Sequence, residues 1–151
     1  MDFSPKKKTS NLLLLIASFA IVSLILWNTN SFFKKFKEEE RHKMEIWATA
    51  QSEFLSLPVD ADPGNLHIKI FQNNTSTPMI LVNKDSTIKV NNMPGIQKTD
   101  TAFIHGKINK FKSENKPISI EYKGENLATL YYGNSEVLTK LKYYPIALLL
   151  I

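Results

Sequence analysis

Side chains that commonly perform catalysis or bind metals are few in this chain. Its three histidines, His42, His67 and His105, are isolated from one another and show no His-Glu-x-x-His or other metal-binding spacing. We interpret all three as surface histidines, although His67 or His105 could sense pH if the fold brings either near a carboxylate. Cysteine is absent, which excludes disulfide bonds, cysteine-bound zinc or iron–sulfur centres and thiol catalysis.

No other motif supports a reaction centre. Asp60 and Asp62 share a short loop, but two carboxylates are too few for the oxygen shell of a divalent cation. The sequence has no glycine-rich phosphate loop and no Gly-x-Ser-x-Gly nucleophile elbow. We therefore predict no catalytic, metal-binding or cofactor-binding residues and expect that this chain is not an enzyme. The net charge of +5 is mild, and Lys and Glu are mixed along the chain, so a nucleic-acid partner is not indicated.

Aromatic residues offer one candidate ligand cavity. Phe71, Tyr122, Tyr131 and Tyr132 lie in segments with strand-like spacing, and His105 lies near the start of a predicted helix. Of these, Phe71, Tyr122, Tyr131 and His105 are the predicted lining of a pocket for a small ligand. Apolar residues at strand spacing more often pack in a core or a sheet, so packing is the favoured interpretation.

An apolar segment near the N-terminus predicts a membrane anchor. No charged residue occurs between positions 9 and 33, and Leu12 to Trp27 is almost entirely apolar. We predict a transmembrane helix over residues 11–31, because about 20 apolar residues cross the hydrocarbon core of a bilayer. A cleaved signal peptide is the main alternative, but no small-x-small cleavage site follows the apolar core.

Basic residues on both sides of this segment bear on its orientation. We predict that residues 1–10 form a basic cytoplasmic tail, because three lysines lie close to the apolar core. More Lys and Arg residues follow the segment than precede it, but a large domain can be translocated despite its charge. The predicted membrane-interface residues at the two ends of the chain are Lys6, Lys7, Lys8, Trp27, Lys142, Tyr143 and Tyr144.

A second apolar run ends the sequence. Tyr143 and Tyr144 precede Pro145, and only apolar residues follow. Interfacial lysine and tyrosine, then proline in a first helical turn, then an apolar run are typical of the entry to a transmembrane helix. We predict that residues 143–151 begin a second, truncated transmembrane helix. The alternative is a short apolar element that docks on the domain.

The residues between the two apolar ends predict an α+β domain over residues 32–142. Residues 32–57 lack Gly and Pro and carry apolar residues at spacings near three, four and seven, which predicts a long amphipathic helix continuing from the membrane. Residues 58–142 predict a PAS-like arrangement, in which a helix packs on a mostly antiparallel sheet of about five strands. The predicted strands cover residues 66–71, 79–82, 87–90, 118–122 and 127–132, and the predicted helices cover residues 101–114 and a last segment after 135.

Finer predictions concern the ends and faces of these helices. Asp100 and Ser135 are the expected N-caps of the two later helices. Ile104, Ile108 and Phe111 are expected on one buried face, because they follow the i, i+4, i+7 spacing. The acidic run from Glu38 to Glu40 is expected to be a solvated face of the long helix.

Several of these segments together resemble a known family. The N-terminal span and the Lys/Glu-rich helix are followed by Pro-Met-Ile-Leu-Val-Asn-Lys-Asp-Ser-Thr-Ile (78–88) and by Tyr-Tyr-Gly-Asn-Ser (131–135) before Leu-Lys-Tyr-Tyr-Pro (141–145). This order is similar to the N-terminal sensor region of two-pass bacterial sensor histidine kinases. The resemblance covers nearly the whole chain but only the input part of that family. It implies a PAS-like domain between two spans of the inner membrane, with the domain in the periplasm.

The resemblance also implies what this chain does not contain. The phosphoacceptor histidine motif and the glycine-rich ATP site of the family are absent here, so ATP and Mg would be bound only by a missing kinase part. A cytoplasmic response regulator would likewise act through that part. The implied partners of the chain itself are the lipid bilayer and a second copy, joined through the long helix and the transmembrane helices. The alternative is a single-anchor envelope scaffold or interaction protein without signalling output.

Overall fold

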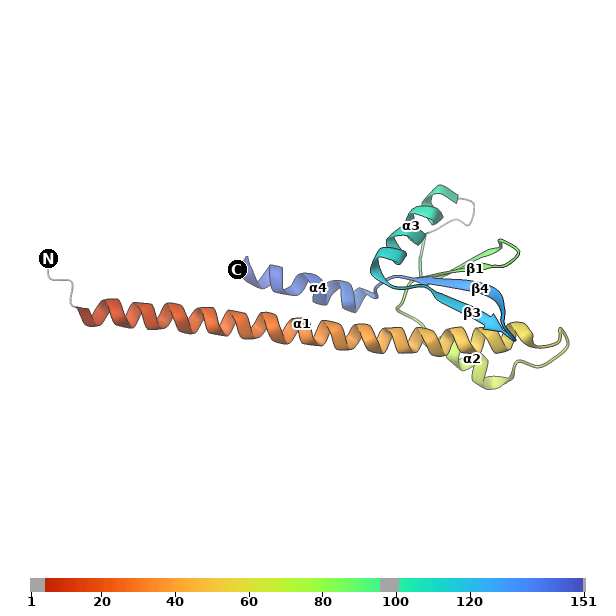
Figure 1. The fold of residues 1–151 in the computed structure, drawn as a ribbon, viewed down its shortest axis with the longest axis horizontal. Coiled ribbons are helices and arrows are strands. Elements are labelled where there is room, and N and C mark those ends of the chain that lie inside the picture. The colour runs from red at the N-terminus through yellow and green to blue at the C-terminus, as the bar shows by residue number, and fades with distance from the viewer. Residues whose placement is uncertain (1–4, 96–100, 151) are drawn as a thin grey trace.

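A single uninterrupted helix, α1 (Pro5–Ser56), forms the N-terminal third of the molecule (Figure 1). The computed structural model describes residues 5–95 and 101–150. The 52 residues of α1 correspond to a rod about 78 Å long. The helix is unbroken because neither Gly nor Pro occurs between positions 6 and 57, and it ends just before Pro58. The predicted transmembrane helix and the predicted amphipathic helix are therefore one continuous element.

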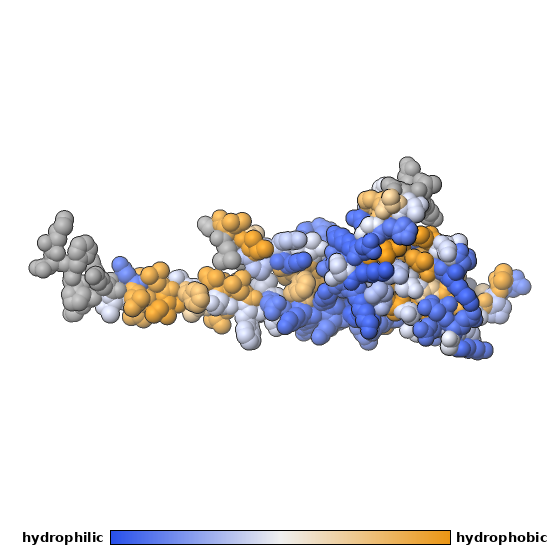
Figure 2. Space-filling view, turned by 45° about the horizontal axis from the view of Figure 1, so that its top comes forward, coloured by the Kyte–Doolittle hydropathy of each residue, from blue (hydrophilic) through white to orange (hydrophobic). Residues whose placement is uncertain are grey.

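The two halves of α1 have different surroundings. In the N-terminal half, the large apolar side chains from Leu12 to Trp27 are exposed. This half makes α1, within the described residues, a helix long and apolar enough to cross a membrane. The C-terminal half packs on the folded domain, where Met44 and Trp47 are buried. Figure 2 shows this division as an apolar shaft projecting from a largely hydrophilic domain.

The sheet has four antiparallel strands in the described residues, not about five as the sequence predicted. They are β1 (Met79–Asn83), β2 (Ile88–Asn91), β3 (Ile118–Tyr122) and β4 (Glu125–Tyr132), in the order β2-β1-β4-β3. The two predicted hairpins, β1–β2 and β3–β4, are confirmed. They join side by side through the first and last strands, with Ile80 opposite Tyr131 and Leu81 opposite Leu130.

The predicted strand at residues 66–71 was wrong, because this segment is part of helix α2 (Gly64–Asn73). Its apolar residues alternate, but they also satisfy a helical period. His67, Ile70, Phe71 and Asn74 fall at i, i+3, i+4 and i+7, and these are the less exposed positions of the segment. The Phe71 ring packs against α1, with its centroid 5.3 Å from that of Trp47. Packing against α1 thus selects the helix over the strand.

Alternate residues of the strands supply two apolar clusters, one on each face of the sheet. The first joins α1 to the sheet and contains Met44, Trp47, Leu81, Leu130 and Tyr132, among others. The second joins the opposite face to helix α3 (Thr101–Glu114) and contains Ile80, Ile104, Ile108 and Phe111. The predicted buried face of this helix is confirmed. The expected cap at Asp100 lies outside the described residues.

The last helix, α4 (Glu136–Leu149), leads away from the domain and runs back beside α1 (Figure 1). Ser135 caps its N-terminus as predicted, because the Ser135 hydroxyl accepts a hydrogen bond from the Leu138 N–H. Pro145 lies inside this helix, not in a first turn as expected, since the helix begins nine residues earlier. The apolar end of α4 therefore lies on the same side of the domain as the apolar half of α1.

Candidate functional site

Four segments of the chain meet at the end of the domain from which the apolar helices leave. We call this region the exit junction and define it by residues 37–41 of α1, residues 77–78 before β1, residues 114–116 after α3, and residues 133–135. The last three residues are the whole connection between β4 and α4. Any movement of α4 relative to the sheet must therefore pass through them.

Gly133 lets α3 approach the end of β4 closely. A Cβ atom placed on Gly133 would lie 2.4 Å from Cε1 and 2.7 Å from Cδ1 of Phe111. These distances are far below the usual carbon–carbon contact of about 3.5–4.0 Å, so only glycine fits beneath this ring. The Gly133 N–H also donates to the carbonyl oxygen of Pro78 at 3.0 Å. The connection is thus held both to α3 and to the segment that enters β1.

Asn134 is held by the end of α3. Its N–H donates to Oε2 of Glu114 at 2.9 Å. Its side-chain Oδ1 accepts from Nδ2 of the buried Asn115 at 3.3 Å, and the same Nδ2 lies 3.2 Å from the Tyr132 carbonyl oxygen. Gly133 and Asn134 are thus each held by contacts with a neighbouring element.

Glu40 ties this connection to α1. Its Oε1 accepts from the hydroxyl of the buried Thr77 at 2.8 Å, and its Oε2 lies 3.4 Å from the N–H of Ser135. The prediction of a solvated acidic face is correct for Glu38 and Glu39, which are exposed, and wrong for Glu40, which is half-buried. One carboxylate thus links the first helix, the entry to the sheet and the start of the exit helix.

Arg41, one residue later, binds the end of β4. Its Nη1 donates to the Tyr132 hydroxyl at 3.3 Å and to the carbonyl oxygen of Lys116, while its Nε donates to Glu45 Oε1 at 2.7 Å. Burial lowers the pKa of Arg41, but the hydrogen bonds to Tyr132 and Glu45 outweigh it and raise that pKa. Burial raises the pKa of Tyr132, and the hydrogen bond from Arg41 opposes this only in part. Tyr132 is therefore a neutral phenol that accepts a hydrogen bond from the permanently charged Arg41 side chain.

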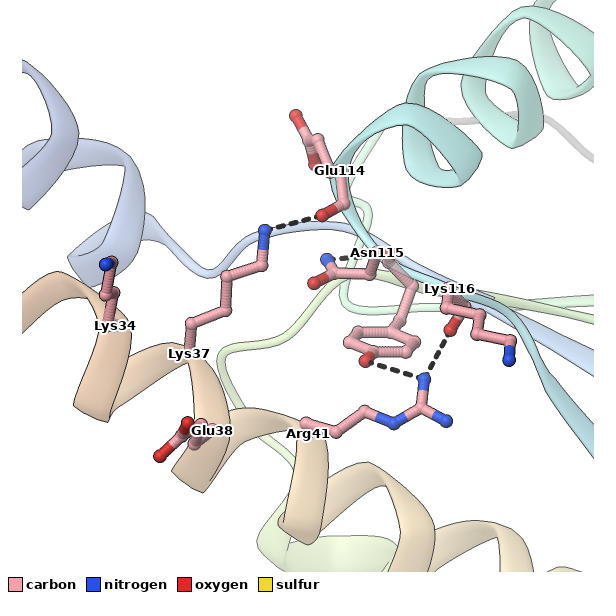
Figure 3. A pocket seen from close by; sticks show the side chains of 8 residues that line it. Lys34, Lys37, Glu38, Arg41, Glu114, Asn115 and Lys116 are labelled. Atoms are coloured by element: carbon pink, nitrogen blue, oxygen red, sulfur yellow. Dashed lines mark hydrogen bonds between the residues drawn. The ribbon is translucent and has the colours of Figure 1, made fainter.

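A groove of about 510 Å³ opens beside this pair, and we call it the basal groove (Figure 3). Lys37 reaches across it, and its Nζ donates to the Glu114 carbonyl oxygen at 2.6 Å. Lys37 and Arg41 thus bind the carbonyl of the last residue of α3 and one just after it, at the end of a helix where carbonyls lack a partner within the helix. The groove is lined by Lys34, Lys37, Glu38, Arg41, Glu114, Asn115, Lys116 and Tyr132.

The structure does not bring the four predicted pocket residues together. Phe71 packs with the cluster on the α1 side of the sheet, whereas Tyr131 packs with the cluster on the α3 side. Tyr122 is exposed at the end of β3, and His105 is exposed on α3. Phe71 and Tyr131 contribute to the two apolar clusters, which agrees with the packing alternative for these two residues.

The predicted membrane-interface residues lie along the two apolar helices. Lys6, Lys7 and Lys8 fall in the first turns of α1, and the Trp27 side chain is 78% exposed farther along it. Lys142, Tyr143 and Tyr144 are exposed on α4, with the Lys142 ammonium 5.7 Å from the centroid of the Tyr143 ring. Trp27 thus lies at the C-terminal end of the apolar stretch of α1, and Lys142, Tyr143 and Tyr144 lie just before the apolar run of α4.

One of the three histidines lies near a carboxylate. His67 Nε2 is 3.2 Å from Glu53 Oε2, and its Nδ1 faces the Pro63 carbonyl oxygen. This contact joins α2 to α1, and it meets the condition under which the sequence allowed a pH-sensing role. His42 and His105 are exposed. Asp62 lies just before α2, and its Oδ1 accepts from the Gly64 N–H at 2.9 Å. Over residues 5–95 and 101–150, no three His, Asp or Glu side chains are grouped as for a metal ion.

Comparison of the chain with protein-family models, with curated proteins and with solved structures found no significant match. The interpretation of the exit junction therefore depends on its geometry. Sequence patterns did not indicate Glu40, Arg41 and Thr77 as site residues, because their partners are distant in the chain. The Tyr-Tyr-Gly-Asn-Ser run (131–135) was a local signal that coincides with the junction, and the run at 78–88 begins within it at Pro78.

Proposed function

We propose that this chain is the sensory input region of a membrane-bound sensor histidine kinase. In this proposal the domain is PAS-like and periplasmic, α1 spans the inner membrane, and α4 begins a second span. The kinase part, with its ATP and Mg, is not in this chain and acts on a cytoplasmic response regulator. The observation that supports this best is the arrangement of α1 and α4, which leave the same end of the domain side by side.

The apolar surfaces of both helices support membrane insertion. The apolar half of α1 is not covered by any described part of the domain, so it needs a non-aqueous environment. The exposed residues Tyr143, Tyr144 and Ile146 of α4 lie on the same side of the domain. Because α1 continues into the domain without a break, a cleavage after the apolar segment would cut within a helix whose C-terminal half supports the core. A permanent anchor is therefore favoured over a removable signal.

The sheet order supports a PAS-like domain. The first and last strands are neighbours at the centre of the sheet, and the intervening helix α3 covers one face. This order places the end of β4 next to the start of β1, so both converge at the exit junction. A change within the sheet would thus reach α4 directly.

The proposed mechanism is a shift between two packings of the domain against α1. A stimulus that favours one packing changes the contacts of Glu40 and Arg41 with the sheet, and α4 moves relative to α1. A coupling of about 1–3 kcal/mol, which is typical of allosteric sites, suffices to bias the output. The proposed assembly is a homodimer, formed through the long helix and the membrane spans.

The test combines the natural sequence downstream of Ile151 with a topology reporter. About fourteen further apolar residues followed by a helical phosphoacceptor segment are expected after Ile151. Alkaline phosphatase, which is active only outside the cytoplasm, is inserted in the Lys123–Gly124 turn or fused after the second span of the natural protein. We expect activity from the first fusion and none from the second.

Two results would contradict the proposal. A stop codon at the end of the apolar run would favour the single-anchor scaffold instead. Phosphatase activity from both fusions would show that the chain crosses the membrane once only, and then α4 could not carry a signal inward.

A further inference from the structure

We propose that the basal groove binds the phosphate of an anionic phospholipid headgroup at the membrane surface. This inference depends on the proposed membrane anchoring of α1. The proposed function names no ligand for the basal groove, and this inference names one. The charge, the unpaired ammonium groups and the depth of the groove relative to the apolar helix each support it.

The groove has more positive than negative side chains. Four cations and two carboxylates line it, which leaves an excess of two positive charges. One of the carboxylates, Glu114, already accepts from the Asn134 N–H and lies 3.7 Å from the Lys110 ammonium. The other, Glu38, points away from Lys37 and Arg41 (Figure 3). The interior of the groove is therefore suited to an anion.

Two of the four cations are free to bind a ligand. Lys37 and Arg41 hold backbone carbonyls and thereby shape the groove. Lys34 and Lys116 are exposed, and within residues 5–95 and 101–150 neither ammonium has a hydrogen-bond or salt-bridge partner. Ammonium groups form strong charge-assisted hydrogen bonds with phosphate oxygens. Figure 3 shows Lys34 and Lys116 on opposite sides of the groove, with Lys37 and Arg41 between them, so each ammonium is available to a phosphodiester at its own side.

The position of the groove along α1 favours a lipid as the source of this phosphate. Lys34 directly follows the uncharged segment that ends at Phe33. At 1.5 Å per residue, counted from residue 31 at the end of the predicted span, Lys34 lies about 4.5 Å and Lys37 about 9 Å from the hydrocarbon. The headgroup layer on each side of a bilayer is roughly 5–8 Å thick. The Lys34 end of the groove therefore lies at headgroup depth, and the volume of the groove falls in the usual range for small-molecule sites.

The test uses the full chain, with α1 inserted in phosphatidylcholine bilayers. Electron spin resonance of spin-labelled phosphatidylglycerol and spin-labelled phosphatidylcholine measures the preference of the protein for the anionic lipid. The variant Lys34→Gln with Lys116→Gln removes the two free ammonium groups and should keep its fold, because neither group has an intramolecular partner. The matched control is Lys69→Gln with Lys89→Gln, two exposed lysines on α2 and β2.

We expect the wild-type chain and the control to prefer phosphatidylglycerol, and the groove variant to lose this preference by on the order of tenfold. An equal preference in all three proteins would overturn the proposal. So would loss of the wild-type preference on adding inorganic phosphate at constant ionic strength, because the groove would then be a site for a free anion. Flotation with neutral vesicles is measured in parallel. A chain that does not float refutes the membrane anchoring itself, whereas a chain that floats without lipid preference refutes the groove alone.

Discussion

Replacing Gly133 by alanine should destabilise the domain, because the added methyl group meets the ring of Phe111. The Cβ atom would lie 2.4 Å from the nearest ring carbon, so the two must separate by roughly 1 Å. Phe111 is only 4% exposed and is surrounded by the cluster on the α3 face, so the ring has little space to move. Overpacking of this kind costs about 1–3 kcal/mol. For a domain of this size, that corresponds to a fall in Tm of roughly 5–15 °C.

The assay is thermal unfolding of the detergent-solubilised chain, followed by near-ultraviolet circular dichroism. Gly106→Ala is the matched control, because Gly106 lies in α3 and a Cβ placed there meets nothing within 4 Å. Alanine at position 106 should stabilise the domain by about 0.5–1 kcal/mol, since it is a better helix former than glycine. The two Gly→Ala changes are thus expected to act in opposite directions.

A double variant separates the clash from any other effect of alanine at position 133. Phe111→Leu removes the ring carbon Cε1, which the new methyl group would approach most closely, at its own cost in apolar burial. In the Phe111→Leu background, Gly133→Ala should cost less than about 0.5 kcal/mol, which gives a coupling of at least about 0.5 kcal/mol. A wild-type Tm for Gly133→Ala, or additive effects in the double variant, would refute the idea that glycine is needed for the close approach of α3.

Three further changes probe the exit junction. Glu40→Ala leaves the Thr77 hydroxyl without its acceptor and should lower the free energy of unfolding by about 1–3 kcal/mol in urea titrations. Glu39→Ala, the control, should change it by less than about 0.5 kcal/mol. Equal effects of the two changes would contradict the role of Glu40. Ser135→Ala removes the N-cap of α4 and should cost about 1 kcal/mol in the same assay. Tyr132→Phe should remove a late-ionising phenol from the absorbance titration at alkaline pH, because burial raises the pKa of Tyr132. Since the unfolded chain releases this proton at lower pH than the folded one, wild-type stability should fall above about pH 10, and this part of the fall should be absent in Tyr132→Phe.

Elements defined by local patterns were predictable from the sequence. Ile104, Ile108 and Phe111 follow a helical period over two turns, and the structure buries all three. The hairpin of β1 and β2 was marked by turn residues between two short apolar runs, and the register agrees with that turn. In these segments the local preference and the tertiary packing favour the same conformation.

The segment at residues 66–71 was mispredicted because two periods fit it. Leu66, Ile68 and Ile70 alternate as in a strand, but Ile70 and Phe71 are neighbours that both pack against the core. In six residues the two patterns cannot be separated by composition, and the decision depends on Trp47 and the rest of α1. The same limit applies to Glu40, whose partners Thr77 and Ser135 are 37 and 95 residues away in the chain. A carboxylate in an acidic run carries no local sign of such partners.

The exit junction also constrains how a signal could travel through it. Gly133, Asn134 and Ser135 are each held to a neighbouring element, so the connection is unsuited to act as a loose hinge. We therefore expect α4 to move together with the end of β4, as one body. This body contacts α1 through the apolar cluster that contains Met44, Trp47 and Tyr132, and through the polar contacts of Glu40 and Arg41. The polar contacts exchange partners at a lower cost than the apolar cluster, so we expect a movement of α4 relative to α1 to change the contacts of Glu40 and Arg41 first.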